Sequence, residues 1–271
     1  MDLNSEKYWE TRFQTDWKSR HGVEQTVLHY ETIVEHLPEY IIESIRQNSY
    51  TICDMGCGLG EGVVELQKTF SSSTVFGIDF SQTAVDEANE KYGSENRKFI
   101  KGDILNNDKY FDVIVLSHVI EHFKNPFEIL KSLSHYSKYL IVAVPFREKN
   151  MCDEHEFRFV YSSFPLKIDN KSLMFFKEIP PMFFEAGNYT VQEQMLVVYA
   201  NEDLSEGHTL ANFNSYYDEK LELDATIKKL KRSESKLKKT NSKLKKENNH
   251  FKSTKAYKFW QFYSNLKKKF F

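Results

Sequence analysis

The chain has 271 residues, of which 40% are apolar and 28% are charged. This suits one large domain with an appendage, or two small domains, and it excludes a wholly disordered chain. No run of 18 apolar residues occurs, and the N-terminus MDLNSEKYWE has no apolar stretch, so we expect neither a membrane-spanning helix nor a signal peptide. Three cysteines are too few for a disulfide framework, which favours a reducing, cytoplasmic location.

The net charge of −2 hides a division of the chain. Residues 219–271 hold 17 of the 37 basic and 5 of the 39 acidic residues, so they carry +12 and the rest carries −14. Such asymmetry indicates two parts with different partners. We therefore predict four segments: a domain over residues 1–205, a linker over 206–218, a coiled coil over 219–251 and a basic aromatic tail over 252–271.

Apolar periodicity predicts helices over residues 4–14, 31–46, 61–70, 82–92 and 126–135, with Ser81 as a cap. It predicts strands over 50–54, 74–79, 97–102, 111–116 and 139–144. Alternating helices and strands are typical of an α/β fold with a doubly wound, Rossmann-like, mostly parallel sheet. Two later strand-like stretches, around Phe175 and over 194–199, suit an antiparallel edge.

A glycine-rich loop, DMGCGLG over residues 54–60, follows the first predicted strand and opens a helix. Glycines there allow a sharp turn and a close approach to a ligand. Asp79 lies 19 residues after Gly60 at the end of the next strand, where a carboxylate can accept both hydroxyls of a ribose. Asp103 ends the third strand, where it can accept an adenine amino hydrogen bond.

These stretches resemble the class I S-adenosylmethionine-dependent methyltransferases that act on small molecules and lipids. The matching segments are residues 52–60, 75–81, 102–104 and 111–122, with YWETRF at 8–13. The resemblance implies that S-adenosylmethionine (SAM) is the cofactor. It implies ten cofactor-binding residues: Asp54 immediately before the loop, Gly56, Cys57, Gly58 and Gly60 of the loop around the methionine part, Asp79 at the ribose, Phe80, Asp103 and Ile104 at the adenine, and Ser117 under the sulfonium.

The alternative for the glycine loop is a dinucleotide-binding domain of the same topology. Its G-x-G-x-x-G pattern expects a glycine or alanine where this chain has Glu61. The methyltransferase interpretation therefore fits the loop better.

Methyl transfer from a sulfonium mainly requires alignment, but a hydroxyl acceptor must also lose its proton, which suits a histidine. His118 follows the fourth predicted strand and His155 lies in the acidic segment DEHE after the fifth. We predict these two as catalytic residues, with a solvated acidic loop as the alternative for His155. His122 is better explained as a packing residue at a helix start.

The sequence predicts no metal site. Cys152 and His155 have ligand-like spacing, but no second such pair occurs. Nucleic acid is an unexpected substrate, because SHVI at residues 117–120 lacks the Asp/Asn-Pro-Pro pattern of amino-methylating enzymes and VPF at 144–146 lacks a Pro-Cys nucleophile. A domain at −14 also repels phosphates.

Heptad spacing marks the C-terminal part, with Leu223, Leu230, Leu237, Leu244 and Phe251 every seven residues. The other seam is Ile227, Glu234, Asn241 and Asn248, and asparagine at such positions favours a dimer. We expect a homodimer through this coiled coil; a single solvated helix is the alternative.

The last 20 residues contain six lysines, no acidic residue and many aromatics, Trp260 and Phe262 among them. This pattern favours a helix that lies on the anionic inner face of the membrane. Nucleic-acid binding through lysines and stacked aromatics is the alternative. A short resemblance to tails of bacterial surface-polysaccharide enzymes also suggests a glycan or lipid-linked acceptor.

Two classes of function follow. The first is an enzyme that O-methylates a small-molecule, glycan or lipid-linked acceptor, in cell-surface polysaccharide biosynthesis for example. The second is a coiled-coil scaffold or nucleic-acid-associated protein whose methyltransferase-like domain only binds the cofactor. The complete set of Asp54, Gly56, Gly58, Asp79 and Asp103 favours the enzyme.

Overall fold

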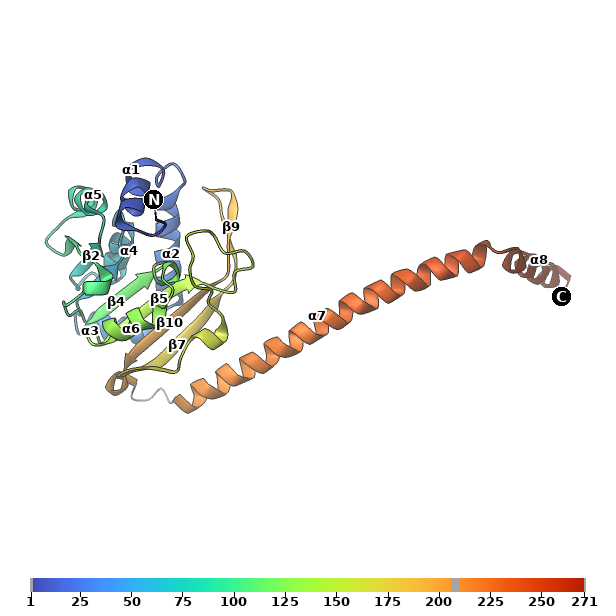
Figure 1. The fold of residues 1–271 in the computed structure, drawn as a ribbon. Helices are drawn as coiled ribbons and strands as arrows, with labels where there is room; N and C mark the ends of the chain where they lie inside the picture. The colour runs from blue at the N-terminus through green and yellow to red at the C-terminus, as the bar shows by residue number, and fades with distance from the viewer. Residues whose placement is uncertain (1, 206–209, 271) are drawn as a thin grey trace. The chain divides into compact units, whose positions relative to one another are not determined.

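The computed structural model describes residues 2–205 and 210–270 (Figure 1). The chain divides into two compact units, Met1–Phe213 and Asn214–Phe271. The predicted linker, 206–218, falls at this division. Residues 206–209 of that linker lie outside the described residues.

An eight-stranded sheet with the strand order β3-β2-β1-β4-β5-β10-β7-β6 forms the centre of the first unit. Its parallel strands are β1 (Ile52–Met55), β2 (Val75–Asp79), β3 (Arg97–Lys101), β4 (Val113–Ser117) and β5 (Tyr139–Pro145). The antiparallel edge consists of β10 (Gln194–Asn201), β7 (Lys171–Ile179) and β6 (Lys167–Ile168). The predicted mostly parallel sheet with an antiparallel edge is confirmed. A separate hairpin of β8 (Met182–Phe184) and β9 (Tyr189–Val191) was not expected.

The helices of the first unit are α1 (Glu6–Thr15), α2 (Gly22–His36), α3 (Glu39–Gln47), α4 (Glu61–Thr69), α5 (Gln82–Tyr92) and α6 (Pro126–Ser134). Short 3₁₀ turns are η1 (Ile104–Asn106), η2 (Ile120–His122), η3 (Tyr161–Ser163) and η4 (Glu202–Ser205). Ser81 caps α5 as predicted, by accepting the backbone N–H of Ala84.

The prediction of one helix over residues 31–46 is wrong, because α2 ends at His36 and α3 begins at Glu39. Pro38 lacks a backbone N–H, and it restricts the preceding Leu37 to an extended conformation. The apolar stripe continues through the break because Ile33, Ile41 and Ile45 all pack into the same core.

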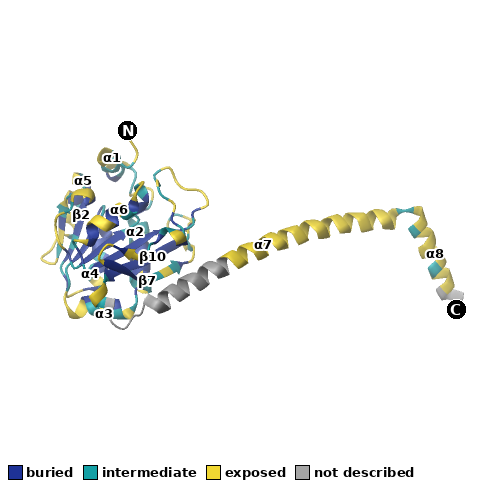
Figure 2. Ribbon diagram, turned by 60° about the horizontal axis from the view of Figure 1, so that its bottom comes forward, coloured by how far each residue is buried: buried dark blue, intermediate teal, exposed yellow. Residues whose placement is uncertain are grey.

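The central parallel strands β1, β4 and β5 are almost entirely buried, as their continuous apolar sequences indicate, whereas β3 at the edge is buried only at Phe99. All four residues of β1 and all seven of β5 are buried. Figure 2 shows the strands as the buried centre of this unit. Because the carboxyl ends of parallel strands lie along one edge of the sheet, the loops that follow β1, β2 and β4 meet there.

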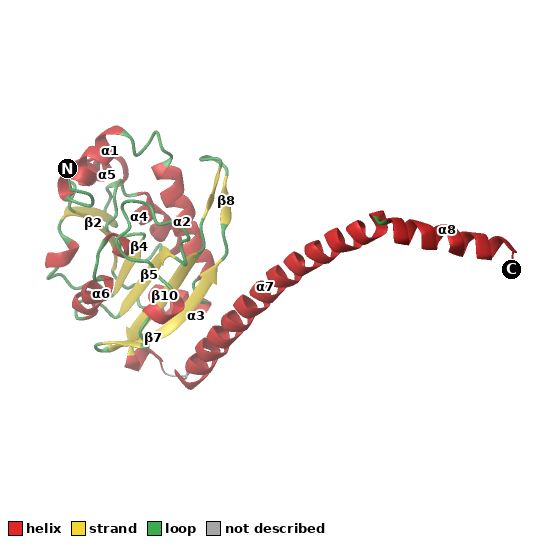
Figure 3. Cartoon of the chain, turned by 45° about the vertical axis from the view of Figure 1, so that its right-hand side comes forward, coloured by secondary structure: helices red, strands yellow, loops and turns green. Residues whose placement is uncertain are grey.

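The C-terminal helices are α7 (Leu210–Ser253) and α8 (Lys255–Phe270) (Figure 3). Helix α7 begins at Leu210, so residues 210–218 of the predicted linker are helical. Helices α7 and α8 meet near Ser253, two residues beyond the predicted end of the coiled coil. Among the described residues, we find no helix that is both long and apolar enough to cross a membrane.

Candidate active site

A cavity of about 320 Å³ lies among the loops that follow β1, β2 and β4. Its volume is at the lower end of the range typical of small-molecule sites. Nine of the twelve predicted site residues line it: Gly56, Cys57, Gly58, Asp79, Phe80, Ile104, Ser117, His118 and His155. Folding therefore brings together residues from both the predicted cofactor set and the predicted catalytic pair.

The glycine loop takes a backbone conformation that side chains disfavour. Gly56 has a φ of +82° and Gly60 a φ of +92°, both in the left-handed region. A Cβ at Gly60 would lie 2.7 Å from the ring of Phe99, and one at Gly56 would lie 2.7 Å from Val119. The loop is thus packed closely around a turn that only glycine permits without strain.

Asp79 fastens the glycine loop to the end of β2. Its Oδ2 accepts the Gly58 N–H at 2.9 Å and its Oδ1 accepts the Ser81 N–H at 2.9 Å. Burial raises the pKa of Asp79 to about 6, although these two backbone hydrogen bonds lower it. Each carboxylate oxygen has a second lone pair, so the group can also accept ribose hydroxyls, as predicted from the sequence.

Three predicted residues do not line the cavity: Asp54, Gly60 and Asp103. Asp54 is buried behind the glycine loop, where the hydroxyl of Tyr30 donates to its Oδ1 and its Oδ2 has no hydrogen-bond partner among the described residues. Burial raises the pKa of Asp54 to about 7. Asp103 is exposed, and its carboxylate accepts the Leu105 N–H at 2.9 Å. Its contact with adenine stays a prediction.

His118 is held from several sides at the end of β4. Its backbone has a φ of +55°, an uncommon conformation for a residue other than glycine, and one that is frequent at functional sites. Its Nε2 lies 2.9 Å from Gln194 Oε1 and its Nδ1 lies 3.3 Å from Glu121 Oε1. The buried ring of His29 stacks on it with centroids 3.8 Å apart, and burial and the charge of His118 lower the pKa of His29.

His155 lies in the segment after β5, which docks onto the loop after β4. The backbone N–H groups of Glu156 and Phe157 donate to the carbonyl of Glu121 at 2.8 and 3.1 Å. The Nδ1 of His155 lies 2.9 Å from Glu148 Oε2. Burial lowers the pKa of His155, but the hydrogen bond to Glu148 and nearby carboxylates outweigh this and raise it overall.

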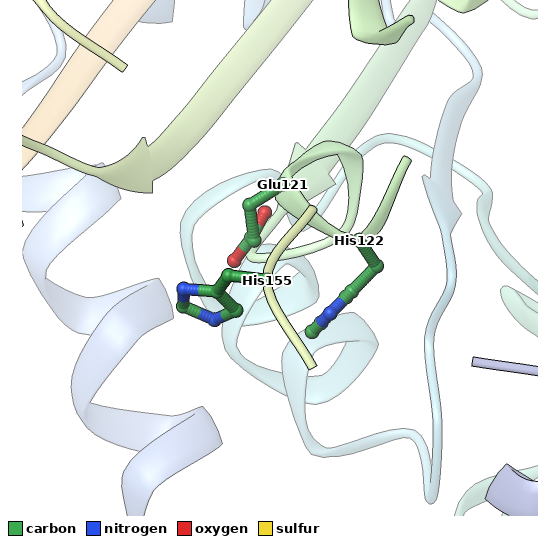
Figure 4. Close-up of side chains that lie close together, drawn as sticks. All are labelled: Glu121, His122 and His155. Carbon is green, nitrogen blue, oxygen red and sulfur yellow. The ribbon is translucent and has the colours of Figure 1, made fainter. Parts of the chain in front are cut away.

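His155 forms a cluster with Glu121 and His122 that the sequence did not predict. Figure 4 shows Glu121, His122 and His155 close together, and one ligand atom from each lies within 4.8 Å of the others. The sequence interpretation of His122 as a packing residue overlooked this. The adjacent pair of Glu121 and His122 after a strand was a local signal of potential metal ligands. The contact of this pair with His155 depends on how the segment after β5 folds back.

Helix α1 covers one side of the cavity, which Trp9, Phe13 and Arg12 line. The Arg12 guanidinium lies 2.9 Å from Glu154 Oε1, and the Tyr8 hydroxyl donates to the same oxygen at 2.6 Å. The N-terminal helix is thereby attached to the segment that carries His155.

Comparison with known proteins agrees with this fold. Residues 46–259 match the model of a family described as a methyltransferase domain. A ubiquinone biosynthesis O-methyltransferase of Rickettsia bellii is 34% identical over 102 residues, which are 35% of this chain and 42% of the relative. A malonyl-[acyl-carrier protein] O-methyltransferase of Halalkalibacterium halodurans is 32% identical over 94 residues, 32% of this chain and 35% of the relative.

Among solved structures, magnesium protoporphyrin IX methyltransferase from Synechocystis PCC 6803 with bound SAM has a TM-score of 0.54 and 16% identity. The alignment covers 74% of this chain and 99% of that one. The chain belongs to the methyltransferase-domain family, and the predicted class I SAM-dependent methyltransferase fold is confirmed. The match spans 42% of the length of the Rickettsia bellii relative.

The affinity for SAM is expected to fall as the pH falls through about 6, the pKa of Asp79. Protonation removes the negative charge and one acceptor site, so the ionised form above this pKa is the form expected to accept the ribose hydroxyls. If one group controls binding, the Kd should be about tenfold higher at pH 5 than at pH 7, because the ionised fraction of a group with a pKa of about 6 falls about tenfold. Calorimetry at both pH values measures this. The Asp79→Asn variant should bind weakly at both, and an equal pH dependence in that variant would contradict the assignment to Asp79.

Proposed function

We propose that the protein transfers the methyl group of SAM to a hydroxyl oxygen of a small-molecule, glycan or lipid-linked acceptor. The observation that carries this proposal is the composition of the cavity. The glycine loop and Asp79 line one part of it, and His118 and His155 line another. A cofactor site therefore adjoins groups that can take a proton.

The residues fit SAM as the methyl donor. The backbone of Gly56 and Gly58 lines the cavity in a left-handed conformation, and the Asp79 carboxylate beside it can accept hydroxyls. In the reaction, the acceptor oxygen forms a bond to the methyl carbon while the carbon–sulfur bond breaks. The electron pair goes to sulfur, which leaves S-adenosylhomocysteine. The hydroxyl proton passes to a histidine on the acceptor side.

Oxygen as the methylated atom is supported by four relatives named as O-methyltransferases, against two from Papaver named as N-methyltransferases. The cavity is partly aromatic, because Trp9, Phe13 and Trp17 line it, and the ring of Trp9 lies next to that of His122 with centroids 5.2 Å apart. Such rings suit an acceptor with an apolar or ring-shaped body. A lipid-linked or cyclic acceptor fits this lining better than a fully hydrated one.

The direct test is incubation of the purified protein with methyl-labelled SAM and a fractionated cell extract. Label should enter one fraction of low molecular mass, and mass spectrometry should place the methyl group on an oxygen. If the protein binds SAM but labels no fraction, the scaffold alternative replaces the enzyme.

We further propose that α7 and α8 localise the domain. The heptad side chains of Leu230, Leu237 and Leu244 are 63%, 67% and 56% exposed in the single chain. This supports pairing through α7, since association would bury them. Trp260 and Phe262 of α8 are 61% and 65% exposed among lysines, which supports contact with an anionic membrane.

Truncation after Tyr217 is expected to give a monomer that no longer sediments with anionic vesicles but still binds SAM. Each lysine near such a surface contributes about 1 kcal/mol, so loss of the tail should abolish sedimentation. Analytical ultracentrifugation and vesicle co-sedimentation measure the two effects. A truncated protein that still dimerises and still sediments would show that both roles of the helices are wrong.

A further inference from the structure

Three potential metal ligands meet at the acceptor side of the cavity. Glu121 and His122 come from η2, directly after β4, and His155 comes from the segment after β5 (Figure 4). One ligand atom of each lies within 4.8 Å of the other two, and all three residues line the cavity. Two imidazoles and one carboxylate form a donor set that suits divalent transition metals.

Glu121 is the residue that points most strongly to a site for a positive ligand. Its side chain is 1% exposed, and neither carboxylate oxygen makes a hydrogen bond among the described residues. Nδ1 of His118 lies 3.3 Å from Oε1. A buried carboxylate without hydrogen bonds is costly, so such groups are usually paired or bound to a metal ion.

Both histidines are oriented by partners at Nδ1. His122 Nδ1 lies 3.0 Å from the backbone carbonyl of Glu154, and His155 Nδ1 lies 2.9 Å from a carboxylate oxygen of Glu148. A carbonyl and a carboxylate only accept hydrogen bonds, so Nδ1 carries the hydrogen in each ring. The lone pair is then on Nε2. Partners of this kind typically orient metal-binding histidines.

We propose that Glu121, His122 and His155 bind a divalent first-row transition metal ion of the zinc or cobalt type. Three protein ligands leave coordination positions open, as in catalytic zinc sites. Because the ligands line the cavity, those positions face the space available to a small molecule.

The role of the ion rests on the proposed function. A metal-bound hydroxyl group loses its proton more readily, so the ion would both hold the acceptor oxygen and ionise it beside the methyl donor. An acceptor with a phenolic hydroxyl or with two neighbouring oxygens would be favoured, because it could occupy two open positions. The metal site itself does not depend on this role.

The test uses the full-length, untagged protein, stripped of metal with a chelator and titrated with Co²⁺ or Zn²⁺ without SAM or acceptor. Calorimetry should give one ion per chain, and Co²⁺ should produce visible absorption bands from bound histidines. Glu121→Gln, His122→Ala and His155→Ala should each lose the bands and weaken binding at least tenfold. Glu148→Gln, which changes only the partner of His155, should weaken binding about 10–100-fold.

His135→Ala is the matched control, because His135 lies at the end of α6 and pairs with Asp169 at 2.9 Å. It should bind Co²⁺ like the unchanged protein. Thermal unfolding followed by circular dichroism checks that each variant folds, and the ion should raise the Tm of the unchanged protein but not of the ligand variants.

Absence of stoichiometric Co²⁺ and Zn²⁺ binding by the folded, unchanged protein would overturn the proposal. So would equal binding and identical spectra in all folded ligand variants. In the first case, Glu121 is instead balanced by charged histidines alone. Binding of the ion without any methyl transfer would refute the proposed function and leave the metal site standing.

Discussion

Replacement of His155 by alanine is expected to lower kcat by about 10²–10⁴-fold, the usual contribution of a positioned proton acceptor. His155 lines the cavity, and Glu148 holds its Nδ1 so that Nε2 is free to act on the acceptor hydroxyl. Whether Nε2 takes the proton itself or holds an ion that ionises the hydroxyl, the acceptor loses its activation. The Kd for SAM should stay within about twofold, because the residues predicted to hold the cofactor are the glycine loop and Asp79.

The measurement is single-turnover methyl transfer together with calorimetric SAM binding. His118→Ala, made in parallel, tests the second predicted catalytic residue. His118 has partners at both ring nitrogens, Gln194 and Glu121, so it is less free to accept a proton. Its loss should reduce turnover less than the loss of His155. Unchanged turnover in both variants would mean that alignment of donor and acceptor is sufficient for the reaction.

The second large effect is expected from Asp79→Ala, which should weaken SAM binding by about 1–3 kcal/mol, or about 5–150-fold in Kd. The substitution removes the predicted acceptor of the ribose hydroxyls. It also removes the acceptor of the Gly58 and Ser81 N–H groups, so the glycine loop loses its attachment to β2. Both effects act in the same direction.

Asp108→Ala is a suitable control, because Asp108 is an exposed carboxylate that does not line the cavity. It should leave the Kd unchanged. Circular dichroism of the Asp79 variant separates lost binding from lost folding. A folded Asp79→Ala protein with the Kd of the unchanged protein would remove Asp79 from the cofactor site.

Local sequence determined most of the fold and the cofactor side of the site. Helices α4 and α5 and strand β2 lie within one residue of their predicted bounds, because their apolar periods and the Ser81 cap are local signals. The glycine loop and Asp79 could also be located, since successive strand ends of a parallel sheet share one edge. The break at Pro38 was equally local, and the apolar stripe that continues across it concealed the break.

Only the tertiary structure decided which side chains meet on the predicted acceptor side of the cavity. Glu121 and His155 are 34 positions apart in the sequence, and they meet because backbone hydrogen bonds dock the segment after β5 onto the carbonyl of Glu121. Asp103 is predicted at the adenine from its position after β3, and the structure adds that its carboxylate accepts N–H groups of Leu105 and Asn106. Sequence periodicity records which residues are buried and where elements end. It does not record which loops pack together, because that depends on contacts between residues distant in the chain.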